Sequence, residues 1–157
     1  MCDKLQESMT ALPHGPEFRF LDRLLSLAPG KSGVGENKVR GDEFSLRGHL
    51  PGEPIFPGVL LVEAGAQLAG VVAQNDPVIK PLAGLKLTAL RAVKIFGSAM
   101  PGETVLLEAT IIGRLGSLVQ AKASASIAGV QVMSGEFTLG GTALADPAEM
   151  PISGSSC

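Results

Sequence analysis

A long apolar run in the middle of the chain most constrains its fold. Residues 59–73 are almost wholly aliphatic or small, and only Glu63 and Gln67 interrupt them. The run contains no central proline and no alternation of polar and apolar residues, which favours a helix that is apolar on all sides. A membrane span needs about 20 apolar residues, and this run is shorter and carries a carboxylate. We therefore expect a helix buried in a protein core and no membrane segment.

Glu63 is the most informative residue of this run. An ionised carboxylate inside a buried helix is costly unless it is paired or keeps its proton. Gln67 follows one turn later, so both polar groups should share one helix face. His49 lies in the preceding loop, residues 48–54, where glycines and prolines forbid regular structure. One interpretation is an acid and a base in a dry cavity. The alternative is a structural Glu63, paired by Gln67 or backbone donors, and a solvated histidine.

The segment from residue 48 to residue 70 carries a family resemblance. It reads GHLPGEPIFPGVLLVEAGAQLAG and resembles the signature GHFPGxPxxPGVLxxEAxAQxAG of the FabZ-type 3-hydroxyacyl-(acyl carrier protein) dehydratases. The match is gapless and contains His49 and Glu63 at the family's spacing for its two catalytic residues. The N-terminal stretch also resembles the family pattern LPHRxPFLLVDRVxxxxPGK. Its matching residues are Leu12, Pro13, His14, Phe18, Asp22, Arg23, Pro29, Gly30 and Lys31.

The resemblance implies a hotdog fold of the α+β class, in which an antiparallel β-sheet wraps around a long central apolar helix. The rest of the sequence agrees with this fold, because strand-like segments flank the helix on both sides. We expect strands at residues 18–27, 34–39, 83–96, 104–112, 118–127 and 130–139. Glycine-containing hairpin turns are expected at residues 113–116 and 128–129.

The chain reads as one domain with short additions at both ends. We assign residues 1–10 to an N-terminal extension and residues 11–140 to the hotdog domain. Residues 141–157 are small, proline-containing and unpatterned, so we expect a flexible C-terminal tail. The N-terminus has no apolar stretch of the kind found in signal peptides, which favours a cytoplasmic protein.

The chemistry that the resemblance implies is removal of water from a (3R)-hydroxyacyl thioester to give the trans-2-enoyl thioester. Neutral His49 suits the base that takes the C2 proton. Glu63 suits the acid that protonates the departing hydroxyl, because burial would raise its pKa. Backbone N–H groups of Gly58 and Val59, at the start of the helix, could bind the thioester oxygen. Gln67 could orient Glu63, and we interpret the other histidine, His14, as structural.

The resemblance also implies partners. The substrate would be carried on the phosphopantetheine of acyl carrier protein, with no metal and no organic cofactor. The resemblance implies a homodimer in which His49 of one subunit faces Glu63 of the other, often assembled further into a trimer of dimers. The net charge of −2 speaks against nucleic acid and means that an acidic carrier would need a local basic patch. The candidates for that patch are Arg19, Lys86, Arg91 and Lys94.

The chain departs from the family pattern around the catalytic loop. Ser45, Leu46 and Leu50 stand where phenylalanines are usual, and Pro16 stands where a tyrosine is often found. We expect this altered lining to shift acyl preference away from short saturated chains. Two alternatives stay open: a hotdog acyl thioesterase, and a non-catalytic acyl-binding subunit that supports an active dehydratase.

Overall fold

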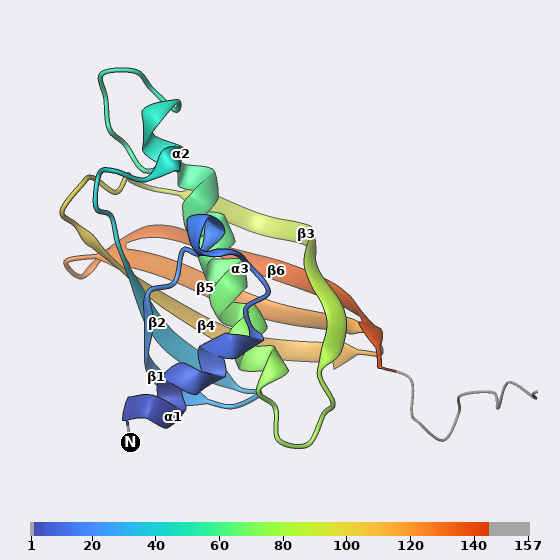
Figure 1. The fold of residues 1–157 in the computed structure, drawn as a ribbon. Helices are drawn as coiled ribbons and strands as arrows, with labels where there is room; N and C mark the ends of the chain where they lie inside the picture. Colours follow the sequence, from blue (N-terminus) through green and yellow to red (C-terminus); the bar gives the residue numbers. More distant parts are fainter. Residues whose placement is uncertain (1, 145–157) are drawn as a thin grey trace, which may run out of the picture.

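A long helix lying across an antiparallel sheet forms the architecture of the chain (Figure 1). The computed structural model describes residues 2–144. Helix α3 (Gly58–Gln74) covers one face of a six-stranded sheet whose strand order is β1-β2-β4-β5-β6-β3. Every strand pairing is antiparallel. This confirms the α+β class and the predicted sheet around a central helix.

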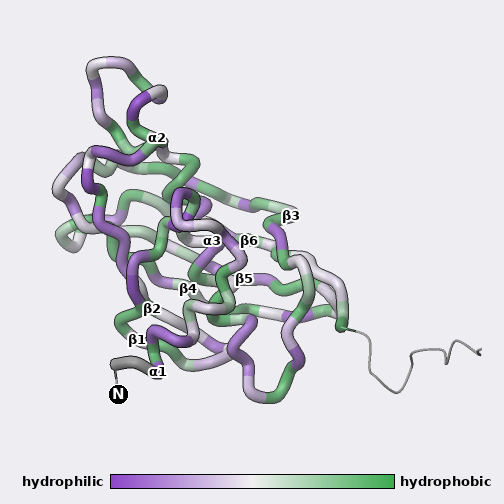
Figure 2. The backbone as a smooth tube through the Cα atoms, in the orientation of Figure 1, coloured by the Kyte–Doolittle hydropathy of each residue, from purple (hydrophilic) through white to green (hydrophobic). Residues whose placement is uncertain are grey.

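The strands follow the hydrophobic pattern of the sequence. Along β4 and β5, buried and exposed residues alternate, and Figure 2 shows the matching change of hydropathy along the chain. The strands are β1 (Arg23–Ala28), β2 (Ser32–Lys38), β3 (Leu82–Ile95), β4 (Thr104–Leu115), β5 (Leu118–Ile127) and β6 (Val130–Ala143). The short helices are α1 (Cys2–Glu7), η1 (Ser8–Ala11), η2 (Pro16–Phe18) and α2 (Phe44–Arg47).

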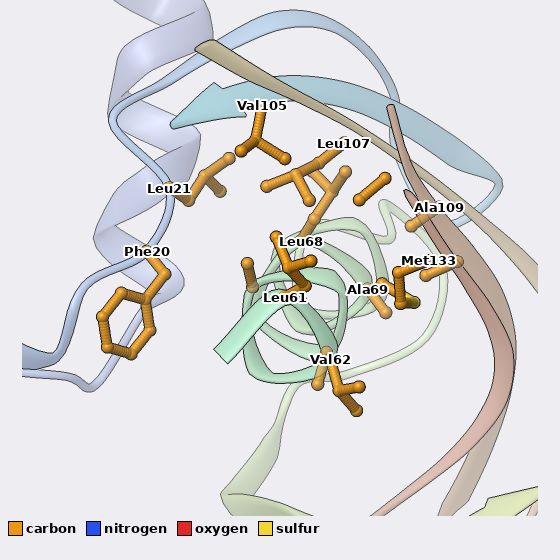
Figure 3. Close-up of a cluster of buried hydrophobic side chains, with 14 of the residues drawn as sticks. Phe20, Leu21, Leu61, Val62, Leu68, Ala69, Val105, Leu107, Ala109 and Met133 are labelled. Carbon is orange, nitrogen blue, oxygen red and sulfur yellow. The ribbon is translucent and has the colours of Figure 1, made fainter. Parts of the chain in front are cut away.

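The core lies between α3 and the sheet. Leu61 and Leu68 of the helix are fully buried and lie close to Leu107 of β4 (Figure 3). Each such leucine stabilises the fold by about 1.5–3 kcal/mol relative to an exposed one. Gly65 allows the close approach of helix and sheet, because a Cβ atom there would lie 3.1 Å from Met133 Cε. Among residues 2–144, no helix combines the length and hydropathy needed to cross a bilayer.

The described part of the N-terminal extension packs onto the domain. Gln6 exchanges two hydrogen bonds with the backbone of Leu24 in β1, at 3.0 and 3.2 Å. Leu5 and Met9 pack against the core, and Asn75 Nδ2 donates to the carbonyl oxygen of Ser8 at 3.0 Å. The residues before the hotdog domain therefore cover the β1 edge and the end of α3.

Most of the predicted strands are present, but several of them begin or end at other residues than predicted. Regular pairing of β1 begins only at Arg23, so residues 18–22 are not part of the strand that we expected from residue 18. β6 continues past residue 140, because Ala143 pairs with Leu82 at the start of β3. The predicted two-residue turn at Ala128 and Gly129 is confirmed, with φ angles of 49° and 81°. Most of the predicted tail, residues 145–157, lies outside the described residues.

Candidate active site

One face of α3 lines a cavity of about 260 Å³. Glu63, Gln67, Gly70 and Gln74 recur at helical spacing along this face. The N-terminal segment forms another part of the wall. The leucines that give the cavity its apolar surface are Leu12, Leu82, Leu85, Leu87 and Leu139. The cavity therefore joins a polar helix stripe to an apolar wall.

Glu63 lies in this cavity with one carboxylate oxygen already in contact with nitrogen atoms. Gln67 Nε2 donates to Glu63 Oε1 at 3.1 Å, and His14 Nε2 lies 3.3 Å from the same oxygen. The Glu63 side chain is 23% exposed in the single chain, whereas we expected full burial. The reason is that Glu63 lines the cavity and does not pack against the sheet.

Gln67 fixes the arrangement around Glu63. It is 2% exposed, and its Oε1 atom accepts the backbone N–H of Phe20 at 2.9 Å. Its Nε2 atom donates to the carbonyl oxygen of Phe18 at 2.9 Å as well as to Glu63. Gln67 thus ties the N-terminal segment to the helix and holds the carboxylate at the same time.

His14 is the residue of this site that our sequence reasoning missed. Its Nε2 atom faces Glu63 Oε1, and its Nδ1 atom is buried without a hydrogen-bond partner among the described residues. Its ring stacks on Phe18 with 6.0 Å between centroids. Linear spacing cannot link His14 to Glu63, because the contact forms only when the N-terminal segment folds over α3. The match of His14 to the family's LPH pattern was the available signal.

His49 lies in the loop that follows α2 and is exposed. Its Nδ1 atom lies 3.2 Å from the carbonyl oxygen of Ile55. Because a carbonyl can only accept, this contact assigns the proton to Nδ1 and leaves Nε2 as the basic nitrogen. His49 lines a second hollow with Ser45 and Val59. Within the described chain, His49 and Glu63 line different hollows and share no hydrogen bond or ion pair.

The N-terminus of α3 borders the hollow around His49. Pro57 precedes the helix, and the first N–H groups have no partner within it. Val59 is 70% exposed, so the first turn is accessible from outside. Glycine at position 58 leaves the approach to these N–H groups free of a side chain. The structure adds a packing reason, because a Cβ atom on Gly58 would lie 3.0 Å from Ile95 Cδ1.

The residues that replace the family's phenylalanines have different environments. Leu46 is buried, Leu50 is exposed, and the Ser45 hydroxyl is buried without a hydrogen-bond partner among residues 2–144. Ser45 lines the hollow of His49, not the cavity of Glu63. An effect of Ser45 on substrate choice should therefore act around His49, whereas Leu46 and Leu50 line a separate hollow.

Glu43 stabilises the turn that leads into α2. Its carboxylate accepts the backbone N–H groups of Arg40 at 2.5 Å and of Gly41 at 2.6 Å. Burial raises the pKa of Glu43, but backbone hydrogen bonds, including those from Arg40 and Gly41, and the charge of Arg40 together outweigh that effect and hold the pKa below its usual value. The ionised form of Glu43 therefore favours the observed turn. Across residues 2–144, the structure contains no group of three or more His, Cys, Asp or Glu side chains suited to hold a metal ion.

The sequence of the chain matches the model of the FabA-like domain family over residues 12–136. It is 36% identical to the 3-hydroxyacyl-[acyl-carrier-protein] dehydratase FabZ of Ruminiclostridium cellulolyticum over 136 residues, which cover 84% of this chain and 92% of that protein. It is 32% identical to the FabZ enzyme of Myxococcus xanthus over 134 residues, covering 83% of this chain and 86% of that one.

Solved structures share the fold at lower sequence identity. A chain of the dehydratase heterocomplex ApeI:P from Xenorhabdus doucetiae superposes with a TM-score of 0.73 at 17% identity, covering 87% of this chain and 91% of that one. Zebra fish thioesterase superfamily member 2 gives a TM-score of 0.66 at 17% identity, covering 88% and 96%. These likenesses support the hotdog fold. With the sequence matches, they show that the chain belongs to the FabA-like domain family, among its FabZ-type hotdog dehydratases.

Proposed function

We propose that this chain removes water from 3-hydroxyacyl thioesters carried by acyl carrier protein, and that His49 and Glu63 of different subunits perform the reaction. The proposal rests mainly on the contacts of the two Glu63 carboxylate oxygens. Its Oε1 atom is in contact with two nitrogen atoms, which leaves Oε2 to act on a substrate. The leucine-lined cavity beside it suits an acyl chain.

The reaction needs one base, one acid and one site for negative charge. His49 Nε2 would take the proton from C2, and the electron pair of that C–H bond would form the C2–C3 double bond. Glu63 would give its proton to the C3 hydroxyl, so that the C–O bond breaks and water leaves. Backbone N–H groups at Gly58 and Val59 would bind the thioester oxygen while it carries negative charge. These side chains supply each proton transfer without a metal or an organic cofactor.

The separation of His49 and Glu63 within one chain supports a dimeric site. Strand β3 is a sheet edge that pairs only with β6 inside the described chain. It is 14 residues long and carries half-exposed Leu90 and Ile95. A long edge strand with exposed apolar residues is a ready surface for pairing with a second chain. We propose that two copies join at β3 and that each Glu63 then meets the partner's His49.

The carrier would approach the side of the molecule that holds His49. Of the four candidate cations, Arg19 lies beside the site and donates to the carbonyl oxygen of His14 at 3.1 Å. Arg91 instead lies 3.8 Å from Glu136, so part of its charge is balanced. Arg47 borders the hollow of His49. We therefore propose Arg19 and Arg47 as the cations that meet the acidic carrier.

Subunit complementation tests the proposal. Purified His49→Ala and Glu63→Gln proteins should each fail to dehydrate a carrier-linked 3-hydroxyacyl substrate. The absorbance of the enoyl product measures the reaction. Mixing them after dissociation should form mixed dimers that each contain one intact His49–Glu63 pair. Random pairing then restores about one quarter of the wild-type activity.

Three other outcomes would contradict the proposal in different ways. A tag on one variant shows whether subunits have exchanged. If the mixture stays inactive after exchange, the two residues do not form a site shared between subunits. Release of the free thiol in place of enoyl product would indicate a thioesterase. Tight acyl-carrier binding by the wild-type protein without turnover would indicate a binding subunit.

A further inference from the structure

We propose that His14 is a positioning residue that holds Glu63 with its reactive proton on Oε2. The inference rests on the proposed function, in which Glu63 is the acid. It concerns a side chain of the same subunit, whereas the proposed base comes from the partner. His14 would act through Glu63 and would not touch the substrate.

The hydrogen bonds around Gln67 determine which atoms face Glu63. Gln67 Oε1 accepts the N–H of Phe20, so the amide nitrogen must be the atom that lies 3.1 Å from Glu63 Oε1. That oxygen therefore already accepts an N–H hydrogen. The contact with His14 Nε2 at 3.3 Å is favourable when Nε2 also carries hydrogen. Gln67 donates to Oε1 and the His14 ring lies beside the same oxygen, which leaves Oε2 as the oxygen that binds an acidic proton.

The other nitrogen of His14 explains why the ring can act as a neutral donor. With hydrogen on Nε2, Nδ1 is an unprotonated acceptor, and it is buried without a partner among residues 2–144. Adding a proton there would bury an N–H group with nothing to accept it. A neutral ring orients Glu63 without placing a positive charge beside it. Such a charge would favour the ionised carboxylate, which cannot serve as an acid.

The surrounding contacts hold His14 in this position. Arg19 donates to the His14 carbonyl oxygen from Nε at 3.3 Å and from Nη2 at 3.1 Å. The Phe18 ring stacks on the imidazole, and the carbonyl oxygen of Phe18 accepts a hydrogen bond from Gln67. Arg19 therefore holds the His14 backbone within the N-terminal segment, and Phe18 connects His14 through Gln67 to the helix that carries Glu63.

Replacement of His14 by leucine and by glutamine tests the inference. Leucine removes the donor, whereas glutamine keeps an N–H donor at a similar distance from the backbone. We expect His14→Leu to lower kcat by about tenfold to one-hundredfold, the range of one hydrogen bond to a charged or reacting group, with a much smaller change in KM. His14→Gln should recover most of that loss. Thermal unfolding of each variant shows whether the fold is retained.

A double variant separates positioning from a general loss of structure. In a Glu63→Gln background there is no acid to position, so adding His14→Leu should cause no further loss in the residual rate. Wild-type kcat in His14→Leu, or an equally low kcat in His14→Gln and His14→Leu, would overturn the inference. The inference would also be overturned if His14→Leu lowered the residual rate of the Glu63→Gln protein by the same factor as it lowers the wild-type kcat. A Glu63→Gln protein with wild-type turnover would instead overturn the proposed function itself.

Discussion

Gln67 joins the central helix, the N-terminal segment and the candidate acid through one amide group. Its two polar atoms bind Phe20 N–H, Phe18 C=O and Glu63 Oε1. A buried backbone group that loses its hydrogen-bond partner destabilises the fold, because nothing then compensates for its removal from water. Gln67 therefore contributes to stability and, through Glu63, to chemistry.

Replacing Gln67 with leucine should affect both properties. The change leaves the backbone groups of Phe18 and Phe20 without partners and removes one donor from Glu63. We expect the free energy of unfolding to fall by about 2–4 kcal/mol and kcat to fall as well. Urea denaturation measures the first effect, and steady-state kinetics measures the second.

Gln74→Leu is the matched control. Gln74 also binds both backbone groups of one residue, Leu82, at 2.6 and 3.0 Å, but it has no contact with Glu63 in the described chain. Because Gln74 lines the proposed acyl cavity, its replacement should lower stability to a similar extent and change KM, but lower kcat much less than Gln67→Leu. Equal losses of kcat in the two variants would contradict a role for Gln67 at the acid.

At the scale of elements, the turn before α2 determines where the His49 loop begins. Glu43 accepts two backbone hydrogen bonds in this turn, and its pKa is lower than usual. A group with a lowered folded-state pKa stabilises the fold above its unfolded-state pKa. That contribution is lost as the pH falls through the folded-state value.

Glu43→Gln should therefore weaken the turn in a pH-dependent way. At neutral pH the variant should be less stable than wild type by about 1 kcal/mol. The difference should shrink below about pH 4.3, the ordinary glutamate value, because protonation then removes the same charge from the wild type. Unfolding curves across this pH range measure the difference.

Asp42→Asn provides the control for simple loss of a negative charge. Asp42 is 84% exposed and lies 3.9 Å from Arg40, so its removal should change stability little at any pH. A stability difference for Glu43→Gln that stays constant from neutral to acid pH would contradict a role for the ionised carboxylate.

At the scale of the whole molecule, the two edges of the sheet differ. The β1 edge is covered by the N-terminal helix through Gln6, whereas the β3 edge has no neighbour within residues 2–144. An uncovered edge of this length favours association. The proposed active site needs that association, because His49 and Glu63 do not meet within one chain.

Leu90→Lys should weaken the dimer without unfolding the subunit. Leu90 is 50% exposed on β3, and a charge there would be buried when two edges pair. We expect a shift toward monomer in sedimentation experiments, and specific activity that rises with protein concentration. Leu115→Lys, at an 80% exposed position in the β4–β5 hairpin, should remain dimeric. Unchanged association of Leu90→Lys would contradict pairing through β3.

The central helix, most of the strands and the residue types of the site could be predicted from the amino-acid sequence. The helix was predictable because an apolar run of that length has few other stable arrangements. The turn at residues 128–129 was predictable because a glycine between alternating segments indicates a hairpin. The gapless match of residues 48–70 provided His49, Glu63 and Gln67 as candidates.

Which of these groups come into contact could not be predicted from the sequence, because it depends on how the folded chain packs. His14 reaches Glu63 because the N-terminal segment folds over α3, and that contact depends on Gln67 binding residues far away in the chain. The placement of β3 at the far edge of the sheet likewise follows from its pairing with β6. Local patterns report how each segment folds, but contacts between distant segments depend on the packing of the whole chain.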